Sequence, residues 1–95
     1  MISFTVRLIF EEGDRTAIAE MLHQLTLASR QEPGCIHYIA HFVQELPLTV
    51  LLYEQYVDDA ALEQHRSSPH FKEYAAGGLY KMRHTRQVEH LDIVD

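Results

Sequence analysis

The spacing of apolar residues along this 95-residue chain alternates between the two-residue period of a strand and the 3.6-residue period of a helix. Strand-like alternation fills three segments: residues 2–10, 35–43 and 49–57. Helical spacing appears between residues 18 and 28, and again after Asp58. Alternation returns from about Thr85, which predicts a fourth strand. The predicted order of elements is therefore β-α-β-β-α-β.

Residues that start or stop helices lie between these segments. Asp14 is placed to cap the first helix, and Glu32-Pro33-Gly34 to end it. Asp58 opens the second helix, which Ser67-Ser68-Pro69 interrupts and restarts, with serine as the cap and proline in the first helical turn. We expect Gly77-Gly78 to weaken or end the restarted helix.

This order of elements predicts an α+β fold of the ferredoxin-like type, an antiparallel sheet with helices on one face, formed by a single domain over residues 1–95. The turn at residues 44–47 makes a hairpin of the second and third strands. The sheet face without helices should be polar. Here both faces of each of these two strands carry apolar residues. In the second strand, Ile36, Tyr38, Ala40 and Phe42 oppose Cys35, Ile39 and Val43, and in the third, Val50 and Leu52 oppose Leu51, Tyr53 and Val57.

We therefore expect a second copy of the chain to cover the bare face, giving a homodimer through the sheet. The formal net charge is −6 and no basic run is present, which argues against nucleic acid as a partner. No apolar stretch reaches the length of about 18 residues that a membrane span requires. The N-terminus lacks the pattern of a signal peptide, and Cys35 is the sole cysteine, which together favour the cytoplasm.

Seven histidines suggest a metal site, but their spacing does not support one. His37 and His41 would lie roughly 13 Å apart along one strand, too far to share an ion. His65 and His70 are separated by a helix break and would converge only by accident of the turn between them. We expect no metal and no cofactor, because nucleotide and flavin fingerprints are also absent. The remaining histidines are interpreted as surface residues: His23, His84 and His90.

A small-molecule pocket is predicted between the third strand and the helix that follows it. Glu54 and Tyr56 share a face at the end of the strand, and His65 shares a helix face with Leu62. If Leu62 packs inward, His65 enters the core beside a carboxylate and can act as a general base near neutral pH. A core histidine bonded to Glu54 or to a backbone carbonyl fits the same spacing.

Three segments of the chain resemble the antibiotic biosynthesis monooxygenase family. They are Glu32-Pro33-Gly34-Cys35-Ile36-His37-Tyr38, Tyr53-Glu54-Gln55-Tyr56, and the stretch from Ala60 to Phe71 that contains Arg66-Ser67-Ser68-Pro69-His70-Phe71. The resemblance implies a dimeric α+β barrel that oxidises quinols or polycyclic phenols without metal or flavin. Relatives cleave haem or isomerise a phosphorylated sugar, so the fold does not decide the reaction.

The chain departs from some of these relatives in its pocket. It has no Trp and no Asn, which haem-degrading and polyketide-oxidising relatives use, and Tyr56 stands where the Trp is usual. The resemblance is therefore greatest to quinol monooxygenases and to the sugar isomerases.

Our first hypothesis is a cofactor-independent monooxygenase that acts on a quinol with molecular oxygen. His65 would be the base, Glu54 its orienting partner and Tyr56 a donor to the substrate oxygen. Four further residues would line the pocket: Tyr38, His70, Phe71 and Tyr74. The alternatives are an isomerase of a small hydroxy-ketone and a ligand-binding module without activity. A phosphate site would favour the isomerase and requires convergence of cations drawn from Arg66, Lys72, Lys81, Arg83 and Arg86.

Overall fold

The computed structural model describes residues 1–11, 13–83 and 85–95. The predicted order of elements is confirmed: β1 (Ile2–Ile9), α1 (Arg15–Arg30), β2 (Cys35–Phe42), β3 (Thr49–Tyr56), α2 (Asp59–Ser67), η1 (Phe71–Leu79), α3 (Tyr80–Met82) and β4 (Thr85–Leu91). Two residues with sequence-based assignments lie outside the described part, Glu12 in the predicted break after the first strand and His84 among the predicted surface histidines.

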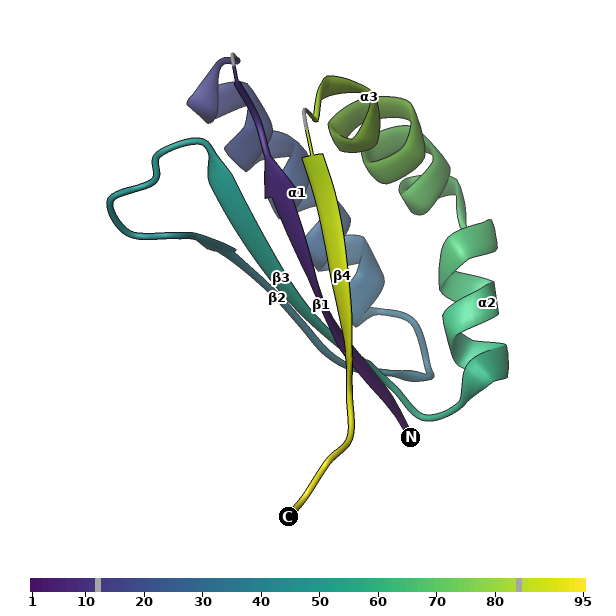
Figure 1. Ribbon diagram of the computed structural model, residues 1–95. Coiled ribbons are helices and arrows are strands. Elements are labelled where there is room, and N and C mark those ends of the chain that lie inside the picture. The colour runs from purple at the N-terminus through teal and green to yellow at the C-terminus, as the bar shows by residue number, and fades with distance from the viewer. Residues whose placement is uncertain (12, 84) are drawn as a thin grey trace.

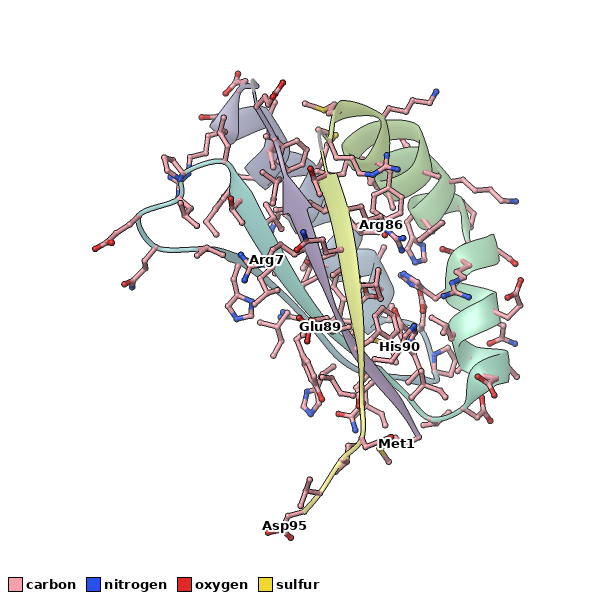
Figure 2. The ribbon with its side chains drawn as sticks, in the orientation of Figure 1. Met1, Arg7, Arg86, Glu89, His90 and Asp95 are labelled. Carbon is pink, nitrogen blue, oxygen red and sulfur yellow. The ribbon has the colours of Figure 1, made fainter. Side chains whose placement is uncertain are left out.

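The four strands form one antiparallel sheet in the order β2-β3-β1-β4, and the helices lie on one side of it (Figure 1). This is the predicted ferredoxin-like arrangement. Paired residues of neighbouring strands share a face, so Val6 lies between Leu52 of β3 and Val88 of β4 on the helix-covered face. Figure 2 shows Arg86 and His90 on the side of β4 toward α2, with Arg7 and Glu89 on the opposite side of the sheet.

Two face assignments in β2, those of Cys35 and Ile36, are wrong, because the strand contains a bulge. The register shifts between Cys35 and His37, so Cys35 pairs with Tyr56 while Tyr38 pairs with Glu54. Cys35 therefore joins Tyr38 on the helix-covered face, and Ile36, predicted to share that face, is 38% exposed. A bulge adds one residue to one strand and so breaks the alternation on which the prediction depends.

The predicted helix starts are confirmed by their capping bonds. The Asp14 carboxylate accepts from the backbone N–H groups of Thr16 and Ala17 at 2.9 and 3.4 Å. Asp58 caps α2 by accepting from Ala61 at 2.8 Å. Ser68 Oγ accepts from the backbone N–H of Phe71 at 3.2 Å and donates to the His65 carbonyl at 2.6 Å, so it joins the end of one helix to the start of the next.

Gly77-Gly78 are predicted to weaken or end the restarted helix, and the structure shows that they do not end it. The helix continues as the π-helix η1 through both glycines and into α3, which ends at Met82. A Cβ at Gly78 would lie 2.9 Å from the sulfur of Met21 in α1. The missing side chain therefore lets η1 pack closely on α1, and this tertiary contact offsets the poor helix propensity of glycine.

The sheet face away from the helices is mixed in character. Pairing places Ile39 beside Tyr53 and His41 beside Leu51 on this face, whereas β1 and β4 contribute mainly polar side chains there: Ser3, Thr5, Arg7, Gln87 and Glu89. The predicted apolar character of both faces thus holds for β2 and β3 but not across the sheet. Among the described residues, no helix has the length and apolar character needed to cross a membrane.

Candidate functional site

His65 enters the core because its neighbours on α2 are apolar. Ala61 and Leu62 precede it by four and three residues, which puts all three side chains on the inner face of the helix. Ala61 and Leu62 are buried, and His65 is only 2% exposed. The predicted inward orientation of His65 is therefore observed.

The loop between α1 and β2 brings Glu32 to the same place. Its backbone is tied down, since Glu32 N–H donates to the Ser29 carbonyl at 3.1 Å and its own carbonyl accepts from Cys35 at 3.1 Å. Gly34 lies against α2 so closely that a Cβ there would overlap the Cβ of Ala61. Glycine is thus required sterically at Gly34 for this loop to approach the helix that carries His65.

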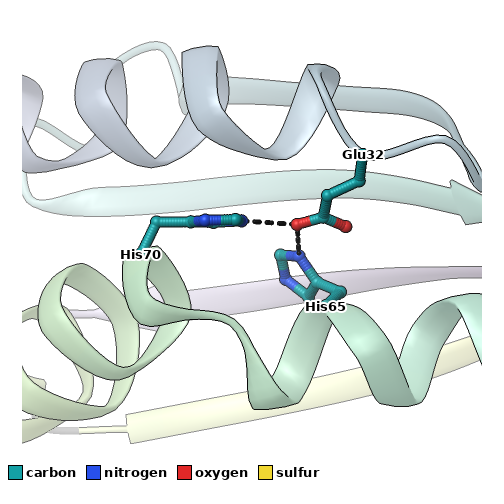
Figure 3. Close-up of side chains that lie close together, drawn as sticks. All are labelled: Glu32, His65 and His70. Atoms are coloured by element: carbon teal, nitrogen blue, oxygen red, sulfur yellow. Dashed lines mark hydrogen bonds and ion pairs between the residues drawn. The ribbon is translucent and has the colours of Figure 1, made fainter.

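One oxygen of Glu32 contacts two histidines (Figure 3). His65 Nδ1 lies 2.8 Å and His70 Nε2 2.5 Å from Glu32 Oε2. A carboxylate oxygen accepts hydrogen bonds, so both ring nitrogens donate, and neutral His65 then carries its proton on Nδ1 and a lone pair on Nε2. The turn at Ser68 does bring His65 and His70 together, because both reach the same carboxylate from consecutive helices.

The second ring nitrogen of His65 faces another carboxylate. His65 Nε2 lies 3.6 Å from Glu54 Oε1, which in turn accepts a 2.6 Å hydrogen bond from the Tyr56 hydroxyl. Burial raises the pKa of Glu54 to about 7, although the hydrogen bond from Tyr56 opposes the shift. Burial also lowers the pKa of His65, against the opposing effect of Glu32. His65 is therefore held neutral beside a carboxyl group that titrates near neutral pH.

Aromatic rings enclose His65 within the helix-covered face. The ring centres of Phe71, Tyr56 and Tyr38 lie 5.2, 5.3 and 5.6 Å from that of His65. These rings exclude water from the imidazole, which accounts for the burial that keeps it uncharged.

A small cavity adjoins the two titratable groups. Its volume is about 20 Å³, close to the space of a single water molecule. It is lined by Phe4, Glu54, Leu62, His65, Arg66, Phe71, Tyr80 and Arg86. Two of the five candidate cations, Arg66 and Arg86, therefore converge on this cavity, and Arg86 also stacks on Tyr80 with its guanidinium carbon 5.0 Å from the ring centre.

Only some of the predicted site residues line this cavity. Glu54, His65 and Phe71 line the cavity, whereas the other four do not appear among its described lining residues: Tyr38, Tyr56, His70 and Tyr74. Tyr56, predicted to donate to substrate, donates to Glu54, and Tyr74 packs against the hydrophobic core. The carboxylate hydrogen-bonded to His65 is Glu32 rather than Glu54.

Sequence reasoning missed Glu32, Tyr80 and the role of the two arginines in lining the cavity. The sequence places Glu32 in a helix stop and in a segment that resembles the family but assigns it no chemical role, and it lies 33 residues from His65 in the chain. Its position in a Glu-Pro-Gly loop gave no chemical signal. The positions of Tyr80 and Arg86 depend on how η1 and β4 pack, which the periodic pattern does not specify.

The donor set at Glu32 could also hold a metal ion. One ligand atom each from Glu32, His65 and His70 lies within 4.8 Å of the others, and two imidazoles with a carboxylate form known zinc sites. Ligand atoms around a tetrahedral ion with bonds of about 2.1 Å would lie about 3.4 Å apart. The contacts of 2.8 and 2.5 Å to Glu32 Oε2 are shorter. They are therefore hydrogen bonds, and a cation would require these groups to move apart.

Comparisons with known proteins agree with this fold. The family model described as antibiotic biosynthesis monooxygenase matches residues 1–77. A solved structure from Pseudomonas aeruginosa has 26% identity and a TM-score of 0.89, covering 99% of this chain and 94% of that one. A second, from Mycobacterium tuberculosis, has 25% identity and a TM-score of 0.85, covering 99% and 95%. An antibiotic biosynthesis monooxygenase with 22% identity and a TM-score of 0.90, covering 100% of both chains, is similar in fold. No curated protein matches the chain.

Proposed function

The chain belongs to the antibiotic biosynthesis monooxygenase family, and we propose that it oxidises a quinol or a related small phenol with molecular oxygen, without metal or flavin. The proposal depends on which ring nitrogen of His65 carries the proton and on the direction of the other. Its Nδ1 donates to Glu32, which leaves the Nε2 lone pair directed toward Glu54 at the cavity. A buried, neutral and oriented imidazole of this kind is suited to act as a general base.

The proposed reaction starts with proton transfer. His65 Nε2 takes the proton of a substrate hydroxyl, and Glu32 stabilises the imidazolium that forms. The resulting phenolate is electron-rich and reduces oxygen directly. One oxygen atom enters the product, the other leaves as water with two of the hydrogens lost by the substrate, and the quinol supplies all four electrons.

The charged groups at the cavity support this first step. A phenol is a much weaker acid than an imidazolium, so its deprotonation by histidine is uphill unless the anion is stabilised. Arg66 and Arg86 line the same cavity as His65 and would lower the energy of a phenolate formed there. Glu54, with a pKa of about 7, would hold or release a proton during the later transfers to oxygen.

A phenol ring is larger than the cavity of about 20 Å³, so substrate binding requires side chains to move. Phe71 and Tyr80 line the cavity from the helical layer, from η1 and α3. We expect a rotation of these two rings to admit the substrate between the helices and β3.

An isomerase of a small hydroxy-ketone is the second candidate. The observation that favours it is the convergence of Arg66 and Arg86, since such an enzyme acting on a phosphorylated substrate would need cations at its pocket. The same base, His65, would move a proton between carbon atoms without consuming oxygen.

We also propose that two chains associate through the bare sheet face in the cytoplasm. Ile39 is among the exposed apolar side chains, and it lies beside Tyr53 on this face. Light scattering at micromolar concentration should give twice the chain mass of 11.0 kDa. A monodisperse monomer would contradict the dimer and leave the chemistry of the helix-covered face untouched.

An oxygen electrode tests the main proposal. The protein is mixed with a panel of quinols and catechols, and a His65→Gln variant of matched concentration serves as the control. We expect oxygen uptake that depends on His65, with one atom of labelled oxygen in the product. Proton exchange or isomerisation without oxygen uptake would favour the second candidate. Saturable binding of a quinol or catechol without turnover of any kind would favour the remaining alternative, a ligand-binding module without activity.

A further inference from the structure

A larger cavity lies away from His65, between α1 and the edge strand β2. Its volume is about 270 Å³, and it is lined from the helix by Ala19, Leu22, His23, Thr26 and Arg30, and from the strand by Ile39, Ala40, His41 and Phe42. No residue that lines the cavity beside His65 lines this one. Any ligand held here would therefore contact a separate set of side chains.

One part of the cavity wall is apolar. Leu22 and Phe42 belong to the hydrophobic core or pack against it, and Ala19 and Ala40 add little side-chain volume. The Arg15 guanidinium lies 4.1 Å from the centre of the Phe42 ring, which holds that ring in place. An apolar cavity of about 150 Å³ accommodates benzene in another protein. A volume of about 270 Å³ thus suits one ring with a short substituent.

Arg30 at the cavity has unused hydrogen-bonding capacity. Arg30 Nε donates to the Tyr38 carbonyl at 3.1 Å, which orients the guanidinium, and no carboxylate of the described residues forms an ion pair with it.

The charge of the lining indicates the charge of the ligand. The chain has a formal net charge of −6, yet the lining includes no Asp or Glu and does include Arg30. His23 adds a further polar side chain, whereas His41 Nδ1 already donates to the Leu51 carbonyl at 2.9 Å. Arginine matches the planar geometry of a carboxylate through paired N–H groups.

We propose that this cavity binds a small carboxylate that carries an aromatic ring or a short aliphatic chain. Arg30 holds the carboxylate, and the apolar part lies against Leu22 and Phe42. This site is independent of the proposed oxidation, because it contains neither His65 nor Glu54, and its strand residues Ile39 and His41 border the sheet face proposed above to join two chains.

Benzoate and benzyl alcohol are suitable probes, since they share a ring and differ in charge. We expect both to cause saturable shifts in amide NMR spectra of the full chain, confined to α1 and β2, with benzoate binding more tightly. Arg30→Gln should weaken benzoate binding at least tenfold and benzyl alcohol binding less than twofold. Arg30→Lys, which keeps the charge, should retain part of the difference. Ala19→Leu should fill the cavity and abolish binding of both.

Three results would contradict this carboxylate site. Shifts that never saturate, or equal benzoate affinity in wild type and Arg30→Gln, would overturn the proposal. Loss of binding in His65→Gln would also overturn it, because the probe would then occupy the acid–base site. Arg30 is exposed, so its variants are expected to fold, and urea midpoints unchanged from wild type check this.

Discussion

The two halves of β3 face the same helical layer but bury different kinds of side chain. In the first half, Val50 and Leu52 are completely buried and lie beside apolar neighbours on β1 and β2. In the second half, Glu54 and Tyr56 are buried to the same degree, and they are joined to each other and lie next to His65.

If the proposed function holds, this difference separates folding from chemistry along one strand. Burial of apolar area in the first half stabilises the fold by roughly 25 cal/mol per Å². Burial of a carboxyl group in the second half is unfavourable unless it is neutral or hydrogen-bonded, which is why Glu54 has a raised pKa and a Tyr56 partner. Substitutions in the first half should therefore change stability, and substitutions in the second half should change reactivity or its pH dependence.

The largest effect is expected for His65→Ala. Loss of the base should lower turnover by roughly 10²–10⁴-fold. Because Glu32 and Glu54 lose a neighbour, the free energy of unfolding should also fall by about 1–3 kcal/mol. Turnover per folded molecule, measured beside the urea midpoint, separates the two effects. A variant that is destabilised but fully active when folded would remove His65 from the mechanism.

Leu52→Ala tests the other half of the strand. It should reduce the free energy of unfolding by about 2–5 kcal/mol through the cavity it creates. Turnover per folded molecule should stay within about twofold of wild type. Leu51→Ala, on the opposite sheet face and only half-buried, is the matched control and should lower the free energy of unfolding by less. A large loss of turnover in folded Leu52→Ala would show that the two halves are not separable.

The pH dependence of the free energy of unfolding should show the raised pKa of Glu54. Its pKa is about 7 in the folded chain against 4.5 as its ordinary value, so the folded state holds more protons on Glu54 between these values. Stability from this group is present at low pH and is lost as pH rises from about 4.5 through 7, by up to about 3 kcal/mol.

Glu54→Gln provides the reference, because its side chain cannot titrate. Urea midpoints of both proteins between pH 4.5 and 8 should diverge, with wild type losing stability relative to the variant as pH rises. His65 acts in the opposite sense, since its lowered pKa removes stability as pH falls below 6.5, but both proteins contain it. Parallel curves would mean that Glu54 titrates normally.

Tyr56→Phe should have the smallest effect. It removes the donor that lies 2.6 Å from Glu54, at a cost of about 1.5–3 kcal/mol if that carboxylate is charged. The pKa of Glu54 should rise further, because the hydrogen bond favours its ionised form. We therefore expect the pH–rate profile of Tyr56→Phe to be shifted to higher pH than that of wild type. Tyr53→Phe, whose hydroxyl contacts Gln55 on the bare face, should leave that profile unchanged.

Local features of the sequence predicted much of the fold. Asp14, Asp58 and Ser68 cap helices as expected, because a cap depends on residues within one turn of it. The inward orientation of His65 followed from its spacing to Leu62. The bulge near Ile36 and the passage of η1 through Gly78 were not predicted, because each depends on contacts between elements.

By itself, the sequence determined the order of strands and helices along the chain and placed His65 on the same helix face as Leu62. Only the tertiary structure decided that Glu32 holds His65 and His70, and that Arg66 and Arg86 share a cavity with Glu54. The physical reason is the range of the interactions. Periodicity and capping act over a few residues, whereas Glu32 is 33 residues from His65 and meets it only after the Gly34 loop packs against α2.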